Sequence, residues 1–225
     1  MGTCIFRMGV NYSLQDTFLS AFFHSQLGHD FYLTGGTALA RFYFHHRESV
    51  DLDFFTQNQS LDFANTHQAL LSMISGLGLT VLRTISVDAF LQYICEDAHG
   101  AGLKIDVVKD VPIHFGAIVE KNGIRLDALE NIGANKILTV FGRTDAKDFI
   151  DLYWILTKTA YTFDHLFSLA RRKDVGLEEI FLSYALDKVS DLEKFPTMLT
   201  DLPWKEIVRY FQDISRQLLL KIKPK

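Results

Sequence analysis

Two acidic residues two positions apart, Asp51 and Asp53, stand in the run Asp51-Leu52-Asp53-Phe54-Phe55. Their apolar neighbours predict a buried strand, in which successive side chains alternate between the two faces, so that both carboxylates lie on the same face. Two carboxylates held side by side need a cation. The spacing is typical of a Mg²⁺ site, because Mg²⁺ takes oxygen ligands from one or two carboxylates and from substrate phosphates.

A Gly35-Gly36-Thr37 turn precedes these acids, between a short apolar strand, Phe31 to Leu33, and an expected helix through Ala38 to Phe42. Such a turn presents backbone N–H groups and a helix N-terminus to an anion. Glycine lets a phosphate approach without meeting a side chain, and the Thr37 hydroxyl is placed to cap the helix or to donate to a phosphate oxygen. We therefore expect Gly35, Gly36 and Thr37 to bind a phosphate group.

A third carboxylate completes a site for two metal ions. In the strand-like segment Leu103 to Val108, Ile105 and Val107 point one way and Asp106 the other. If this strand neighbours the first, Asp106 faces the same side as the Asp51 and Asp53 pair. Two ions roughly 3.5–4 Å apart can then hold the attacking and leaving oxygens of an in-line displacement at phosphorus.

A second group of charged residues lies in the helical pattern that follows. Lys136 and Arg143 are seven residues apart, and Gly142 is expected to end one helix before Thr144 or Asp145 caps the next. Asp148 and Asp151 lie one turn apart on this second helix. From these residues alone, a surface helix with ordinary ion pairs is the favoured interpretation.

Together these segments resemble the nucleotidyltransferase fold of DNA polymerase beta and the aminoglycoside nucleotidyltransferases. They resemble more closely the AbiEii/AbiGii nucleotidyltransferase toxins of bacterial abortive-infection and toxin–antitoxin systems. The resemblance covers roughly residues 30 to 155 and rests on four motifs in order: Gly35 to Leu39, Arg47 to Phe54, Lys136, and Arg143 to Asp151.

The resemblance implies a Mg²⁺-dependent transfer of a nucleoside monophosphate from an NTP to an acceptor hydroxyl. It implies that Asp51, Asp53 and Asp106 bind two Mg²⁺ ions and that Lys136 contacts the triphosphate. Either Asp106 or Asp148 then accepts the proton of the acceptor hydroxyl. For the whole protein it implies a toxin that modifies RNA such as tRNA 3′ ends, with a cognate antitoxin as partner.

The elements that must position these residues form an α/β fold, a mixed sheet flanked by helices with a helical C-terminal half. Helices are expected near residues 14–22 and 61–74, and strands at 79–85, 89–94, 103–108 and 115–119. From about residue 126 the pattern is helical, with helices at 129–141, 145–157, 163–172, 177–188 and 204–222. We expect a nucleotidyltransferase-like core over residues 1–125 and a mainly helical part over residues 126–225.

Composition sets further bounds. The chain has 225 residues, a formal net charge of −4 and only two cysteines, so we expect no general attraction to nucleic acid and no disulfide framework. Neither a signal peptide nor a membrane-spanning run is apparent, which favours a cytoplasmic protein. Three alternatives stay open: transfer to a small aminoglycoside-like acceptor, a non-catalytic nucleotide-binding or interaction module, and a metal-dependent nuclease.

Overall fold

The structure, a computed structural model, describes residues 9–222 of the chain. It contains two compact units, and each is assembled from separate stretches of sequence. The first unit comprises the chain up to Ala38, Ser49–Pro112 and Ile118–Asp127, and the second comprises Leu39–Glu48, Ile113–Ala117 and the chain from Ala128. The expected domain boundary between residues 125 and 126 stays a prediction. The two units are not continuous in sequence, because Leu39–Glu48 and Ile113–Ala117 precede this boundary and belong to the helical unit.

The first unit is built on a seven-stranded sheet in the order β3-β4-β5-β2-β1-β7-β6. Strands β2 and β5 pair in parallel, as do β1 and β7, whereas the other neighbours are antiparallel. The predicted mixed α/β sheet is thereby confirmed. The strands are β1 Tyr32–Thr34, β2 Asp51–Thr56, β3 Thr80–Val87, β4 Phe90–Glu96, β5 Gly102–Lys109, β6 Val119–Lys121 and β7 Ile124–Leu126.

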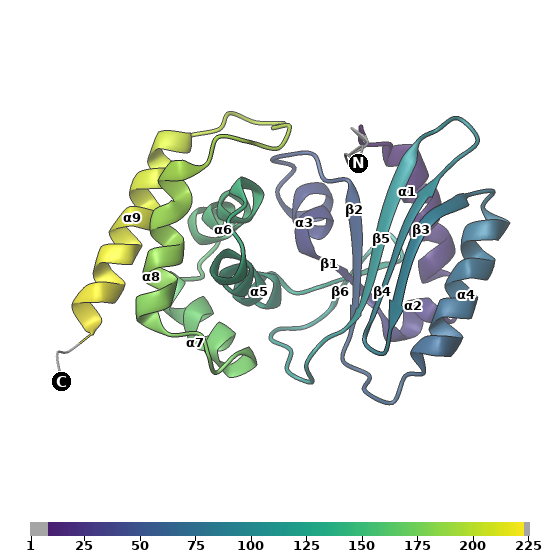
Figure 1. The fold of residues 1–225 in the computed structure, drawn as a ribbon, viewed down its shortest axis with the longest axis horizontal. Helices are drawn as coiled ribbons and strands as arrows, with labels where there is room; N and C mark the ends of the chain where they lie inside the picture. Colours follow the sequence, from purple (N-terminus) through teal and green to yellow (C-terminus); the bar gives the residue numbers. More distant parts are fainter. Residues whose placement is uncertain (1–8, 223–225) are drawn as a thin grey trace, which may run out of the picture. The chain divides into compact units, whose positions relative to one another are not determined.

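Helices α1 (Tyr12–Phe23), α2 (Leu27–Asp30) and α4 (Phe63–Gly76) lie on one face of this sheet (Figure 1). The Asp62 side chain caps α4 by accepting from the Ala64 N–H. In the core between α1 and the sheet, Phe22 stacks on Phe54 of β2 with ring centroids 3.9 Å apart. Because strand residues alternate, this buried packing of Phe54 directs Asp51 and Asp53 to the opposite face.

The strand expected over residues 115–119 is wrong. The chain runs irregularly through this stretch, and β6 begins only at Val119. Phe115 instead belongs to the helical unit, where its buried ring lies 4.9 Å from the Arg172 guanidinium. A short apolar run favours a strand in sequence analysis. Here Phe115 is buried because it packs against a helix that is distant in sequence.

The second unit is helical, which confirms the expected C-terminal architecture. Its helices are α5 Leu129–Gly142, α6 Ala146–Lys158, α7 Phe163–Lys173, α8 Glu179–Asp187 and α9 Trp204–Lys221, with a 3₁₀ turn at Lys188–Asp191. Helix α5 contacts both α6 and α7, and α8 pairs with α9. The predicted break between α5 and α6 is present, since α5 ends at Gly142 and the Asp145 side chain caps α6.

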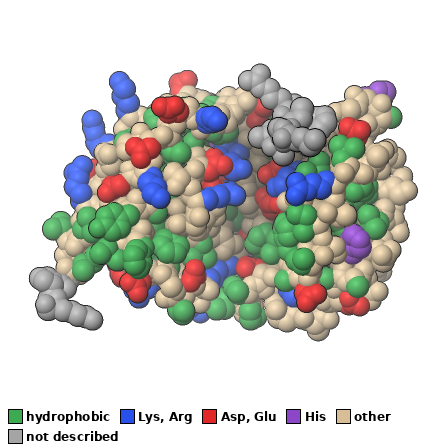
Figure 2. All heavy atoms as spheres, in the orientation of Figure 1, with side chains coloured by type: hydrophobic (Ala, Val, Ile, Leu, Met, Phe, Trp, Pro, Cys, Tyr) green, Lys and Arg blue, Asp and Glu red, His purple; other side chains and the backbone are tan. Residues whose placement is uncertain are grey.

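The surface of the helical unit carries both signs of charge. Figure 2 shows Lys and Arg side chains interspersed with Asp and Glu over α8 and α9, beside a group of apolar side chains. Phe181 and Tyr184 of α8 and Leu220 of α9 are exposed apolar residues of these two helices. Between residues 9 and 222, no helix combines the length and apolar character needed to cross a membrane.

Candidate active site

The three predicted metal-binding acids share one face of the first unit's sheet. Strands β2 and β5 pair so that Asp53 lies beside Asp106 and Asp51 beside Lys104. The burial along β2 alternates as expected, with Leu52 and Phe54 fully buried and Asp51 and Asp53 partly exposed. The predicted common orientation of Asp51, Asp53 and Asp106 is therefore present, although no metal ion tests their role as ligands.

Gly35 begins the turn that follows β1 and lies against these acids. Its φ of +68° is in the left-handed region that glycine adopts without strain. A Cβ placed on Gly35 would come within 2.5 Å of Asp53 Oδ2, so the Asp53 carboxylate would have to turn away to admit a side chain there. The absence of a side chain at residue 35 lets the turn and the carboxylate pack closely in this arrangement.

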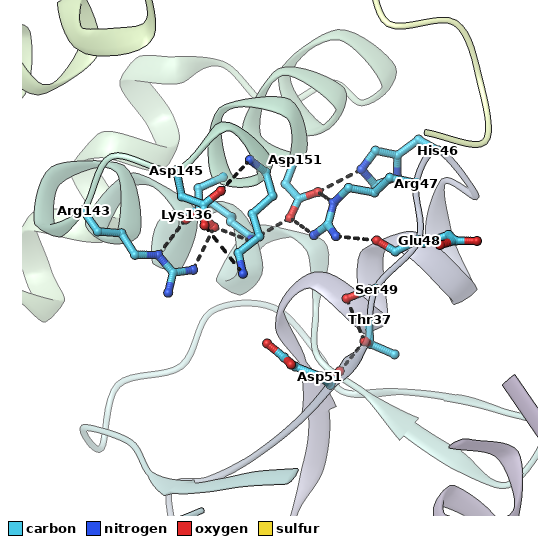
Figure 3. A network of polar contacts seen from close by, with 12 residues as sticks. Thr37, His46, Arg47, Glu48, Ser49, Asp51, Lys136, Arg143, Asp145 and Asp151 are labelled. Atoms are coloured by element: carbon cyan, nitrogen blue, oxygen red, sulfur yellow. Dashed lines mark hydrogen bonds and ion pairs between the residues drawn. The ribbon is translucent and has the colours of Figure 1, made fainter. Parts of the chain in front are cut away.

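The turn continues into a helical stretch, α3 (Gly35–Thr37) and then a π-helical segment, Ala38–Tyr43. Figure 3 shows the Thr37 side chain pointing to Ser49 and Asp51. The Thr37 hydroxyl shares a 2.9 Å hydrogen bond with the Ser49 hydroxyl and donates to the Asp51 backbone carbonyl. The expectation that it caps the helix is wrong, because the buried hydroxyl fixes the turn to β2 instead; a phosphate contact from Thr37 stays a prediction.

Two further side chains hold Asp106 in place. Gln92 of β4 donates from Nε2 to Asp106 Oδ1 over 2.9 Å, and Lys104 donates from Nζ to Asp106 Oδ2 over 2.8 Å. Lys104 Nζ also lies 3.3 Å from Asp51 Oδ2. Burial by itself would lower the pKa of Lys104, but the carboxylates of Asp51, Asp106 and Asp53 outweigh burial and raise it. An ammonium group thus neutralises part of the acidic face.

The donor set on this face fits a hard divalent cation. Carboxylate oxygens are the ligands that Mg²⁺ prefers, and three of them on two neighbouring strands match a two-ion site. Within residues 9–222, however, no three acidic, histidine or cysteine side chains converge on one point as a ready-made metal centre. The Lys104 ammonium contacts oxygens of two of these three carboxylates.

The second unit contains a buried charge network centred on Asp151 of α6. Arg47 donates to both carboxylate oxygens of Asp151 over 2.7 Å, and Lys136 Nζ lies 2.6 Å from Oδ2. His46 Nε2 lies 2.8 Å from Oδ1, and its ring stacks on Trp154. Figure 3 shows His46 and Arg47 both directed at Asp151. Burial alone would raise the pKa of the Asp151 carboxyl, but Arg47 and then Lys136 hold that pKa well below its usual range.

Lys136 connects this network to Asp148, one turn earlier on α6. Its ammonium donates to Asp148 Oδ1 over 2.8 Å, and Arg143 Nε donates to Asp148 Oδ2 over 2.8 Å. Burial disfavours the Asp148 carboxylate, yet Lys136 and Arg143 together lower its pKa. Lys136 is only 6% exposed and bonds two carboxylates, so this structure holds it as an internal counter-ion. The roles of Lys136 on a triphosphate and of Asp148 as a base stay predictions.

Three contributors were not found from the sequence. His46 reads as one of a chance His45-His46 pair, because the partner that explains it lies 105 residues later. Lys104 could have been predicted from the sequence, because it stands two residues before Asp106 and therefore lies on the same face of the strand. Gln92 could not, because only the antiparallel register of β4 and β5 places it beside Asp106.

Comparison with known proteins places the chain in a family. The family model of the nucleotidyl transferase AbiEii toxin of type IV toxin–antitoxin systems matches residues 17–211. The chain belongs to the AbiEii family. The match includes both the acidic face of the sheet and the charge network of α6, and it identifies the chain as a member of a nucleotidyltransferase toxin family. Among proteins with curated functions, none matches the chain.

Solved structures agree with the AbiEii assignment at the level of the fold. Two Helicobacter pylori structures are each 19% identical to the chain, with TM-scores of 0.62 and 0.61. The second is JHP933, and the alignment covers 93% of this chain and 90% of JHP933. MenT4, a nucleotidyltransferase toxin of Mycobacterium tuberculosis, is 14% identical with a TM-score of 0.52, and the alignment covers 91% of this chain and 82% of MenT4.

Proposed function

We propose that this AbiEii-family chain is a Mg²⁺-dependent nucleotidyltransferase that moves a nucleoside monophosphate from an NTP to a hydroxyl of an RNA acceptor such as tRNA. One observation carries the proposal. Asp51, Asp53 and Asp106 share a face on neighbouring strands, directly beside a glycine turn that can approach a phosphate.

Asp51 and Asp53 are proposed to bind both ions, and Asp106 one of them. When bound, Mg²⁺ would stabilise the negative charge that develops on the phosphate and on the attacking and leaving oxygens. Asp106 is 14% exposed in its side chain and is oriented by Gln92, so it is accessible to an ion while its position is defined. The metal-free geometry differs from a closed metal centre, so binding involves a rearrangement of these side chains.

The remaining residues of this face position the reactants. The backbone N–H groups of Gly35 and Gly36 supply donors for the triphosphate, and the Thr37 hydroxyl fixes the turn to β2 through the Asp51 carbonyl. The acceptor oxygen bonds to the α-phosphorus while the bond to the bridging oxygen breaks, and pyrophosphate leaves with that electron pair. Asp106 is proposed to receive the proton of the acceptor hydroxyl, with Asp148 as the alternative that the family resemblance implies.

The RNA acceptor rests on the family and not on a surface feature. Charges of both signs are interspersed over α8 and α9, so that face has no continuous basic field for an RNA backbone (Figure 2). Contact with an RNA end would therefore need a local group of basic side chains. A cognate antitoxin is likewise proposed from membership of a type IV toxin–antitoxin family.

The acceptor is tested by label transfer. Purified protein with Mg²⁺ and total tRNA is incubated with each NTP, labelled either at the α-phosphate or at the γ-phosphate. Label that enters RNA only from the α-position supports nucleotidyl transfer and identifies the nucleotide. Shortened RNA would indicate a nuclease instead, and label found only on added aminoglycoside would indicate a small-molecule acceptor.

A further inference from the structure

Lys104 stands inside the proposed metal site. It lies beside Asp51 in the pairing of β2 and β5, and two residues before Asp106 on the same strand face. Its ammonium group contacts Asp106 Oδ2 at 2.8 Å and Asp51 Oδ2 at 3.3 Å. The cation therefore bridges two of the three carboxylates to which a metal ion would bind.

This contact is partly removed from solvent, which makes it stronger than a pair on the open surface. The side chain of Lys104 is 28% exposed and that of Asp106 is 14% exposed. Gln92 occupies the other oxygen of Asp106, so both oxygens of this carboxylate already accept a hydrogen bond. A metal ion that binds Asp106 therefore competes with these two hydrogen bonds for the carboxylate.

An ammonium and a divalent ion compete for the same oxygens. Mg²⁺ binds oxygen at 2.0–2.1 Å with strict geometry, and its positive charge repels a neighbouring ammonium in this partly desolvated place. Both cations cannot lie between Asp51 and Asp106. Metal binding must therefore break the Lys104 contacts, and the flexible four-carbon stem of lysine allows the ammonium to move away.

We propose that Lys104 is a built-in cation that holds the metal-binding carboxylates in the metal-free protein and is displaced when a divalent ion binds. This inference rests on the proposed function, because it assumes that these carboxylates bind metal. A displaced ammonium finds acceptors in the oxygens of a triphosphate, whereas a free metal ion brings none. Lys104 therefore makes the site bind a metal–triphosphate complex in preference to the metal alone.

The two halves of this proposal predict opposite changes for the metal alone and for the metal–triphosphate complex. Removing the Lys104 ammonium tightens binding of the metal alone, because no hydrogen bond must be broken. The same change weakens binding of the metal–triphosphate complex, because a phosphate partner is lost. A general loss of positive charge would produce the same two shifts in Lys109→Met, so that variant separates the contact with Asp51 and Asp106 from net charge.

The test measures the affinity of the full chain for Mn²⁺ in the absence of nucleotide, by electron paramagnetic resonance and by calorimetry. Lys104→Met removes the charge and keeps an apolar side chain of similar length. Lys104→Gln also removes the charge but keeps an N–H donor, and it serves as a second variant if the first folds poorly. Lys109→Met is the matched control, because Lys109 lies on the same strand but bonds to the backbone carbonyls of Gln59 and Leu61. Asp53→Asn identifies the binding site.

We expect Lys104→Met and Lys104→Gln to bind Mn²⁺ about tenfold more tightly than the unchanged chain, as loss of a competing charged hydrogen bond predicts. Lys109→Met should leave the affinity unchanged, and Asp53→Asn should abolish binding. With equimolar Mn²⁺ and tripolyphosphate as the probe, both Lys104 variants should bind more weakly.

The outcomes separate this inference from the proposed function. Unchanged or weaker Mn²⁺ binding by both Lys104 variants, with binding still lost in Asp53→Asn, overturns the role of Lys104 and leaves the metal site standing. Tighter binding of the tripolyphosphate complex overturns the selectivity. Absence of Mn²⁺ binding in the unchanged chain and in both Lys104 variants overturns the metal site as well.

Discussion

Gly35 and Asp53 are packed so closely that a single added carbon atom on Gly35 would lie 2.5 Å from Asp53 Oδ2. Gly35 belongs to the turn that is proposed to bind phosphate, and Asp53 belongs to the strand that is proposed to bind metal. A side chain on residue 35 would displace the Asp53 carboxylate, which is proposed to bind metal. The φ of +68° adds backbone strain to any substitution at Gly35.

Gly35→Ala is expected to reduce nucleotide transfer by about a hundredfold, the effect of displacing a reacting group by roughly 1 Å. It also places alanine at a φ of +68°, which costs roughly 1–2 kcal/mol of stability. The control is Gly76→Ala, since a Cβ there meets nothing within 4 Å. Initial transfer rates and urea unfolding of the three proteins check this. Full activity of Gly35→Ala would show that the close approach is not needed.

Asp151→Asn is expected to lower the free energy of unfolding by about 3–5 kcal/mol, because it leaves the buried Arg47 and Lys136 with an uncompensated charge. Urea unfolding at neutral pH measures the change. Asp164→Asn is the surface control, since Asp164 pairs with an exposed Lys221 and should change stability by less than about 1 kcal/mol. Equal effects of the two substitutions would mean that the Asp151 network contributes little.

The stabilisation by Asp151 should depend on pH in one direction. Its carboxyl pKa is lowered in the folded protein, whereas the unfolded chain has the ordinary value of about 3.9. The contribution is therefore complete above about pH 5 and is lost as the pH falls through the folded pKa. We expect the stability difference between the unchanged chain and Asp151→Asn to be constant from about pH 5 to 8 and to shrink below about pH 4. A difference that already disappears near pH 6 would contradict this.

Local rules predict the acidic face well and the charge network poorly. The alternation of side chains in strands places Asp51, Asp53 and Asp106 correctly, because each orientation follows from its immediate neighbours. The Arg47 and Asp151 pair joins residues 104 positions apart, and nothing in the sequence around either one indicates the partner. Similarly, Thr37 reads as a helix cap until its burial against Ser49 is known. Sequence periodicity cannot predict contacts that depend on tertiary packing.

Asp148 and Asp106, the two candidates for the proton acceptor, are expected to differ in their effect on stability. Asp148→Asn should lower both the transfer rate and the free energy of unfolding, because Lys136 and Arg143 both donate to the buried carboxylate. Asp106→Asn should lower the transfer rate by at least about a hundredfold, the lower end for a lost acid–base group, with a smaller effect on stability. Transfer rates beside urea unfolding distinguish them. A fully stable, inactive Asp148→Asn would favour Asp148 as the base.

The most direct measurement compares transfer of α-labelled nucleotide to RNA by the unchanged chain, Asp53→Asn and Asp88→Asn in the presence and absence of Mg²⁺. Asp88 is the matched control, because it is an exposed residue in the turn between β3 and β4. The account predicts Mg²⁺-dependent label in RNA from the unchanged chain and from Asp88→Asn, and none from Asp53→Asn. Equal labelling by all three proteins would show that the acidic face of the sheet is not the catalytic centre.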